Sequence, residues 1–227
     1  NLVLNAPMDV DSTALQKIEV FKNEMKRSPN INSATMTSEI PGKPFIEIST
    51  IRKKSDEAVD GTTSSFIEID HDFLKTYNVE IVAGRDFVKE DVGNFFYEGD
   101  PNNDPNLYRV LINRATAKAL GFSSPEAAIN AKIVFKYGPS DRTGEVIGVV
   151  ENYHHRSLEN DYDKILFLYP SYYFADYMTV NVSGKNVAAT VATIESQFNK
   201  LFPKDPFNFF FLNEHFNKQY RADQKFG

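Results

Sequence analysis

The sequence predicts an α+β protein in which a helix-and-sheet domain is interrupted by a strand-rich insertion. Amphipathic helices with clear start and stop signals are predicted near both ends of the chain, and short runs of β-branched and aromatic residues dominate the middle. The length of 227 residues suits one elaborate domain or two subdomains. We therefore expect a first part over residues 1–88, an insertion over 89–164 and a second part over 165–227.

The composition excludes several classes of function. The chain has no cysteine, so it has no disulfide, no thiol nucleophile and no thiolate metal site. Its 25 lysines and arginines are scattered among 31 aspartates and glutamates, and the net charge of -6 argues against nucleic acid as a partner. The sequence has no run of about 18 apolar residues that could cross a bilayer, and no signal peptide is visible. We expect the fragment itself to be soluble and to be excised from a longer protein.

The first part of the chain predicts a helix followed by strands. Residues 13–16 form a capping box, and apolar residues at helical spacing follow until Ser28 and Pro29 end the helix. Alternating side chains then predict three strands, over 34–40, 45–52 and 65–69. The last two of these strands are expected to form a hairpin with a long polar connection.

Short helices and strands alternate along the rest of the chain. Asparagine is the predicted N-cap of three helices, over 114–120, 187–201 and 214–226. Asn78 is expected to close a short helix over 72–77 by adopting the left-handed conformation. Further strands are predicted over 79–83, 108–112, 131–137, 145–150, 164–169, 177–182 and 207–212. This order, with helix and sheet at both ends, is what predicts the interrupted domain.

Four segments resemble one protein family. Residues 145–158, with the sequence EVIGVVENYHHRSL, combine a β-branched strand with an abrupt polar exit. This segment is similar to the large extracytoplasmic domain of FtsX-type ABC-transporter permeases, the MacB-like periplasmic core domain, in its Bacteroidetes-type form. Residues 66–87, 111–129 and 209–220 resemble further motifs of the same family.

The resemblance implies a fold and a function. The fold would be a two-layer, porter-like α/β body, formed by residues 1–88 and 165–227, with a strand-rich, sabre-like subdomain inserted over 89–164. Such domains lie on the periplasmic side of the inner membrane, between the first and second transmembrane helices of a permease. They are not enzymes and hold no cofactor. They relay the motion of an ATPase to a peptide, lipid-linked or drug-like cargo.

The resemblance also implies partners and a mechanical role for the last helix. The expected partners are a second permease subunit, a cytoplasmic ATPase subunit or domain, and a periplasmic adaptor as a further candidate. The segment over 209–220 looks like the one that leads into the second transmembrane helix, so we expect this helix to act as a rigid lever that tilts the domain. The residues assigned to this membrane-coupling helix are Glu214, Phe216, Tyr220 and Phe226.

The candidate metal ligands are Glu151, His154, His155, Asp161 and Asp163. Adjacent histidines that leave a strand point to opposite sides, and the spacing lacks the i,i+4 histidine pair of zinc enzymes, so a structural role is favoured. The sequence also lacks nucleotide-binding and hydrolase motifs. We assign no catalytic, cofactor-binding or metal-binding residue. The alternatives are a metal-dependent hydrolase that uses Glu151, His154 and His155, and a stand-alone periplasmic binding module.

An aromatic cluster is the candidate contact surface. Tyr172, Tyr173 and Phe174 precede the strand that begins at Tyr177. Such a cluster packs into the core at a hairpin corner or, if it is exposed, contacts a partner domain or an apolar cargo. Core packing is the more frequent outcome for such residues. If the cluster is functional, we assign it to contact with a partner domain or an apolar cargo.

Overall fold

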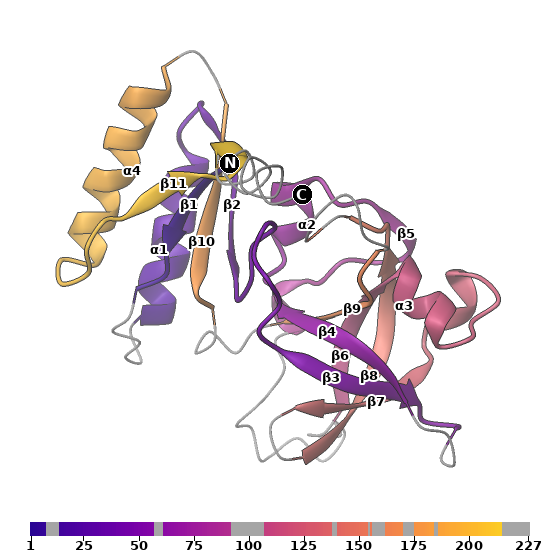
Figure 1. Ribbon diagram of the computed structural model, residues 1–227. Coiled ribbons are helices and arrows are strands. Elements are labelled where there is room, and N and C mark those ends of the chain that lie inside the picture. The colour runs from indigo at the N-terminus through magenta and orange to yellow at the C-terminus, as the bar shows by residue number, and fades with distance from the viewer. Residues whose placement is uncertain are drawn as a thin grey trace, which may run out of the picture.

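The chain folds into two separate β-sheets with helices packed against them (Figure 1). The computed structural model describes residues 1–7, 14–56, 61–91, 107–137, 140–153, 155, 162–169, 175–183 and 186–214. One sheet has four strands in the order β11-β1-β10-β2, and the other has seven in the order β5-β8-β6-β9-β4-β3-β7. In this described part, no helix is both long enough and apolar enough to cross a bilayer.

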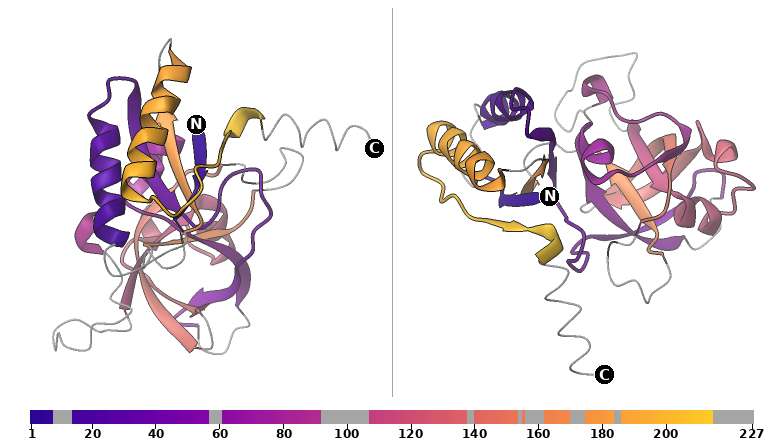
Figure 2. Two further views of the ribbon diagram at one scale, coloured as in Figure 1. Left: turned by 90° about the vertical axis from the view of Figure 1, so that its left-hand side faces the viewer. Right: turned by 90° about the horizontal axis from the view of Figure 1, so that it is seen from above.

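The four-stranded sheet brings together segments from the first and last parts of the described chain. Its strands are β1 (Leu2–Asn5), β2 (Ile31–Thr37), β10 (Tyr177–Val182) and β11 (Phe209–Phe211). Helices α1 (Ala14–Lys26) and α4 (Val187–Leu201) lie side by side over one face of this sheet (Figure 2). The ring of Phe21 on α1 meets that of Phe198 on α4 edge to face at 6.2 Å. The two helices therefore share one apolar core with the sheet.

The seven-stranded sheet closes on itself. Its strands are β3 (Ile48–Lys53), β4 (Thr62–Glu68), β5 (Ile81–Gly84), β6 (Leu107–Asn113), β7 (Lys132–Tyr137), β8 (Ser140–Val150) and β9 (Ile165–Leu168). The long strand β8 pairs with β7 as well as with β6, so the strands β8, β6, β9, β4, β3 and β7 form a closed ring, which we call the barrel. Closure leaves those strands without free edges, and their alternate side chains fill the interior.

Four short helical segments complete the structure: α2 (Phe73–Tyr77), α3 (Arg114–Ala119) and the 3-10 turns η1 (Lys89–Asp91) and η2 (Glu126–Ala128). Helix α2 lies between the barrel and the four-stranded sheet. Its Phe73 and Leu74 pack into an apolar cluster on the outside of the barrel. On its other side, Thr76 donates a hydrogen bond to Ser33 at 2.9 Å, and Tyr77 is hydrogen-bonded to Thr179 at 2.8 Å. The two sheets thus meet through a largely polar contact.

Most predicted elements are present, and several predicted caps have the expected geometry. The Asn113 side chain accepts from Thr116 N and that of Asn186 from Ala189 N, and Asn78 has φ 55. Strand β1 was not predicted, because four residues at the start of a chain show too little periodicity. Strand β8 begins at Ser140 and is therefore longer than expected. The final helix is described only over residues 212–214.

The sheets divide the chain at places different from the predicted domain boundaries. Strands β3, β4 and β5 belong to the barrel, although they lie within the predicted first part, and β9 belongs to the barrel although it follows residue 164. The four-stranded sheet uses the chain only up to Thr37 and again from Tyr177. Parallel pairing of β4 with β9, Ser65 opposite Ile165, joins segments that local sequence patterns cannot relate. The division at 88 and 164 remains a prediction about domains.

Asn113 is the cap on which the barrel depends most. Its Oδ1 atom accepts from the backbone nitrogens of Thr116 and Ile165, and its Nδ2 atom donates to the carbonyl of Asp163. Replacing this fully buried residue leaves those backbone groups unpaired, so Asn113→Ala is expected to lower the free energy of unfolding by about 2–4 kcal/mol. The exposed cap Asn186 is the control, and Asn186→Ala should cost about 1 kcal/mol. Equal losses in urea unfolding would contradict this assignment.

Candidate functional site

The contact between the two sheets is held by a buried charge cluster, which we call the charged joint. It consists of Lys22 and Lys26 on α1 and of Asp70 and Asp72 in the turn before α2. The Lys22 side chain is 2% exposed, and its Nζ atom lies 2.5 Å from Asp70 Oδ2 and 2.9 Å from Asp72 Oδ2. Lys26 lies at the rim and contacts Asp72 at 2.9 Å. Helix α1 is thereby bonded to the segment that leads from the barrel into α2.

Asp70 links three elements through one carboxylate. Besides the Lys22 ammonium, it accepts hydrogen bonds from Thr35 Oγ1 at 2.5 Å, from Met36 N at 3.0 Å and from Asp72 N at 3.0 Å. These bonds satisfy the buried carboxylate, which is the condition under which a buried charge is tolerated. The joint therefore fixes the position of the four-stranded sheet relative to the barrel.

The pKa values of the joint show that its charges are retained. Burial by itself raises the pKa of Asp72, but Lys22 and Lys26 outweigh this effect and hold it below its ordinary value. Burial likewise disfavours the Lys22 cation, yet the neighbouring Asp70 and Asp72 raise the pKa of Lys22 above its ordinary value. Lys22 and Asp72 therefore remain ionised at neutral pH.

Removal of the Lys22 charge tests the joint. Lys22→Met keeps the length of the side chain but leaves Asp70 without a cation and Asp72 with only Lys26 at the rim and His71 at 3.6 Å. We therefore expect the free energy of unfolding to fall by about 3–5 kcal/mol. The control is Lys26→Met on the same helix, whose side chain is 38% exposed and whose loss should cost at most about 1 kcal/mol. Urea unfolding monitored by circular dichroism measures both. Similar losses for the two variants would show that the buried ion pair is not the stabilising contact.

A second, acidic region lies where the barrel touches the end of β2. Ser38 and Glu68 exchange two hydrogen bonds of 3.0 Å, and Thr37 bridges to Ile69. The Glu68 carboxylate is buried, accepts a hydrogen bond from the hydroxyl of Tyr137, and carries an Oε2 atom without a hydrogen-bond partner among the described residues. Burial raises the pKa of Glu68 to about 7, although the Tyr137 hydrogen bond favours the charged form.

Two further carboxylates share this acidic region. Burial raises the pKa of Glu39, whose Oε1 atom accepts from Ile46 N at 2.9 Å, and burial also raises the pKa of Asp176. Lys43 is the cation beside them, and its Nζ atom donates to the Tyr177 hydroxyl at 2.6 Å. This region therefore becomes less favourable as its carboxylic acids ionise, which is the opposite of the behaviour of the charged joint.

The acidic region predicts a fall of stability with pH. The folded chain keeps a proton on Glu68 that the unfolded chain releases near 4.5, so the free energy of unfolding should fall as pH rises from about 4.5 to about 7. For Glu68 alone the fall is on the order of 2–3 kcal/mol. Glu68→Gln should reduce it, whereas Glu195→Gln at an exposed site on α4 should not. Urea unfolding at about pH 5 and about pH 8 measures the difference. An unchanged pH dependence in Glu68→Gln would refute the assignment.

The predicted contact and lever residues are only partly described. Tyr177 is half-buried in β10, with Lys43 bound to its hydroxyl and positioned 4.6 Å from its ring centre. Tyr172, Tyr173 and Phe174 lie outside the described residues, so the aromatic cluster remains a prediction. Glu214 lies in the described first turn of the final helix. Phe216, Tyr220 and Phe226 lie outside the described residues as well.

The structure separates the candidate metal ligands that it describes. Glu151 is ion-paired with Arg114 at 2.7 Å, whereas the buried His155 ring stacks on Phe45 with a centroid distance of 4.0 Å. His154 and Asp161 lie outside the described residues. In the part of the chain that is described, no group of three His, Asp or Glu side chains is placed to hold a metal ion. Glu151 and His155 thus each contact a neighbouring side chain, and their structural role stays a prediction.

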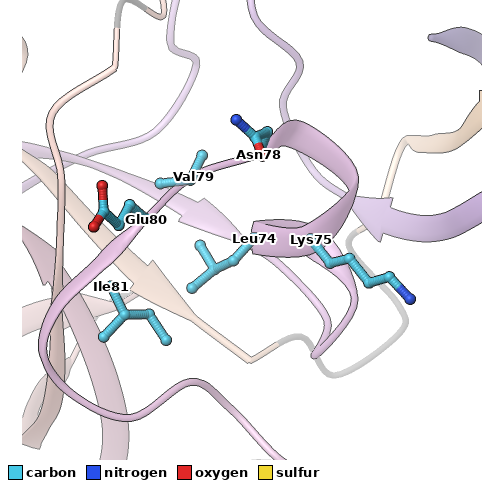
Figure 3. Close-up of a pocket in the computed structure, with 6 residues that line it drawn as sticks. All are labelled: Leu74, Lys75, Asn78, Val79, Glu80 and Ile81. Atoms are coloured by element: carbon cyan, nitrogen blue, oxygen red, sulfur yellow. The ribbon is translucent and has the colours of Figure 1, made fainter.

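Two surface pockets offer space without catalytic groups. One has a volume of about 500 Å³ and is lined by residues 74, 75 and 78–81, where Lys75 and Glu80 point to opposite sides (Figure 3). The other, of about 310 Å³, lies beside Phe45 and Ile48. Neither lining contains a nucleophile held by a general base, so the notable chemistry of the described chain is the buried charge between the sheets. A lysine on the apolar face of the first helix, between Phe21 and Met25, is the sequence signal that could have revealed it.

Comparison with known proteins identifies the fold. No protein-family model matches the chain, and no curated protein matches its sequence. Among solved structures, the periplasmic region of MacB from Actinobacillus actinomycetemcomitans is similar, with a TM-score of 0.57 and 16% identity over 98% of this chain and 91% of that chain. The extracellular domain of the noncanonic ABC-type transporter YknZ from Gram-positive bacteria has a TM-score of 0.55 and 16% identity over 93% of this chain and 100% of that chain. The chain therefore has the fold of the MacB-like periplasmic domain of ABC-transporter permeases, the family that four segments of its sequence resemble.

Proposed function

We propose that this chain is the extracytoplasmic domain of an FtsX/MacB-type ABC permease subunit. In this role it carries out no reaction itself. It relays motion driven by an ATPase on another chain or domain and so acts on a peptide, lipid-linked or drug-like cargo, in efflux or in mechanotransmission. The domain faces the periplasm, and its partners are a second permease subunit, the ATPase and a periplasmic adaptor.

The pairing of the first and last described strands is the observation that carries this proposal. Strand β1 pairs antiparallel with β11, with Leu2 opposite Phe211, and Leu212 N donates to Asn1 O at 3.0 Å. In an antiparallel pair, the start of one strand and the end of the other lie at the same end of the sheet. A transmembrane helix before β1 and another after β11 would thus enter one bilayer next to each other, as a permease requires.

A continuous path leads from these two strands to the barrel. Strand β1 pairs with β10, and β10 pairs with β2. The end of β2 is bonded to Asp70, which Lys22 ties to α1. Because each step is a hydrogen-bonded sheet contact or a buried ion pair, displacement of β1 and β11 moves the barrel as a body instead of deforming the sheet.

The final helix is the proposed lever, and a helix-breaking substitution in the full-length transporter tests it. Tyr220→Pro removes a backbone donor and kinks a helix at a cost of about 3 kcal/mol, so it should abolish transport while ATP hydrolysis continues. Tyr220→Phe is the control, because it keeps the helix. The measurements are cargo transport and ATPase activity of the reconstituted permease. Transport at the control rate in Tyr220→Pro would rule out the lever mechanism.

A further inference from the structure

Strand β11 forms an outer edge of the four-stranded sheet in the described part of the chain. We propose that a second copy of this chain adds its own β11 to this edge, antiparallel, about a two-fold axis that passes Phe210. The inference deepens the proposed function, because it assigns the surface at which two permease subunits would meet on the periplasmic side.

The backbone of β11 presents hydrogen-bonding groups to the outside. Leu212 N donates to Asn1 O, so this pair is a hydrogen-bonded pair of the β1–β11 ladder, and Phe210 opposite Val3 is the next one. Successive residues of a strand point their N–H and C=O groups to alternate sides. The N–H and C=O groups of Phe209 and Phe211 therefore point away from β1, towards the open edge.

The side chains along this edge form an aromatic row. Phe207 contacts Phe209 with a ring-centre distance of 5.5 Å, and Phe209 contacts Phe211 edge to face at 5.8 Å. The inner end of the row is covered, since Phe207 packs on Phe198 of α4. Phe209 in the middle of the row remains 41% exposed. The row thus has an apolar side that nothing in the described chain covers fully.

Apart from its short length of three residues, the edge lacks the features that normally prevent strand association. Exposed edge strands are usually protected by charged side chains, by proline within the strand or by a bulge. Residues 207–212 have the sequence FNFFFL, which contains no charge and no proline. The pairing of β11 with β1 also runs without a register shift. An unprotected edge of this kind is typical of a strand that has a partner.

The strand that fits this edge is β11 of a second copy of the chain. With the two-fold axis at Phe210, Phe209 of one copy lies opposite Phe211 of the other, and their outward N–H and C=O groups pair in both directions. The two aromatic rows then lie on the same face of a continuous eight-stranded sheet, where cross-strand aromatic pairs contribute about 0.2–1 kcal/mol each. Because the strand is short, the contact is weak for free domains and becomes strong when a membrane holds both copies close together.

Disulfide trapping at the axis tests the proposal, because the chain has no cysteine of its own. At the axis, Phe210 would face its own counterpart in a non-hydrogen-bonded pair, where the Cα atoms are about 4.5 Å apart and a disulfide can form. The Phe210→Cys chain should therefore form a disulfide-linked dimer under mild oxidation. Its rate should exceed that of Val187→Cys on α4 by about tenfold or more, although Val187 is 41% exposed and Phe210 is only partly exposed.

A charge on the edge provides the second arm of the test. Phe209→Lys places a cation on the aromatic row, so Phe209→Lys/Phe210→Cys should cross-link no faster than Val187→Cys. Sedimentation of chains without cysteine gives an independent measurement. The apparent mass of wild type and of Val187→Lys should rise with concentration, and that of Phe209→Lys should not. Circular dichroism confirms that each variant is folded.

Two results would overturn the proposal. One is trapping of Phe210→Cys no faster than that of Val187→Cys, and the other is fast trapping that persists in Phe209→Lys/Phe210→Cys. Either result would show that β11 does not pair with itself. Neither result bears on the Tyr220→Pro experiment, which measures coupling between ATP hydrolysis and transport, so failure of the dimer contact is distinguishable from failure of the proposed function.

Discussion

The ion pair of Lys22 with Asp70 and Asp72 is the interaction on which the arrangement of this molecule depends. Two charged aspartates in the turn before α2 are tolerated in the interior because a lysine from α1 and hydrogen bonds from β2 satisfy them. Apolar contacts hold each half together internally, but they have no direction. The charged joint has strict geometry, so it fixes how the four-stranded sheet is oriented on the barrel.

A second contact between the four-stranded sheet and the barrel depends on pH in the opposite way. Burial raises the pKa of Glu68, so this carboxyl is most compatible with the folded state while it carries its proton. The charged joint, by contrast, needs the Asp72 carboxylate ionised, because Lys22 holds the pKa of Asp72 low. The interface between the two sheets therefore contains one region that is stabilised when its carboxyl group ionises and one region that is destabilised. The proposed transmission of force would benefit from this combination, because the charged joint keeps its ion pair at neutral pH.

The position of the chain ends connects this rigidity to function. Strands β1 and β11 are neighbours, so in the proposed function force applied through either strand would enter the same sheet. From there it reaches the barrel through hydrogen bonds and the buried ion pair. The exposed edge of β11 lies directly beside the end that would be pulled. A contact between two copies at this edge would couple the motion of two subunits without requiring any chemistry at the site.

Local chemistry in the sequence determined the helices, their caps and most strands of this protein. Asn113, Asn186 and Asn78 act where they were predicted, because capping depends only on residues within a few positions. The missing catalytic motifs also predicted a domain without an active site, and this stays a prediction. The tertiary structure alone decided that Lys22 meets Asp70, that β4 pairs with β9 to help close the barrel, and that β1 lies beside β11. Such contacts join residues far apart in the chain, and their partners are chosen by the packing of the whole fold, which no local periodicity encodes.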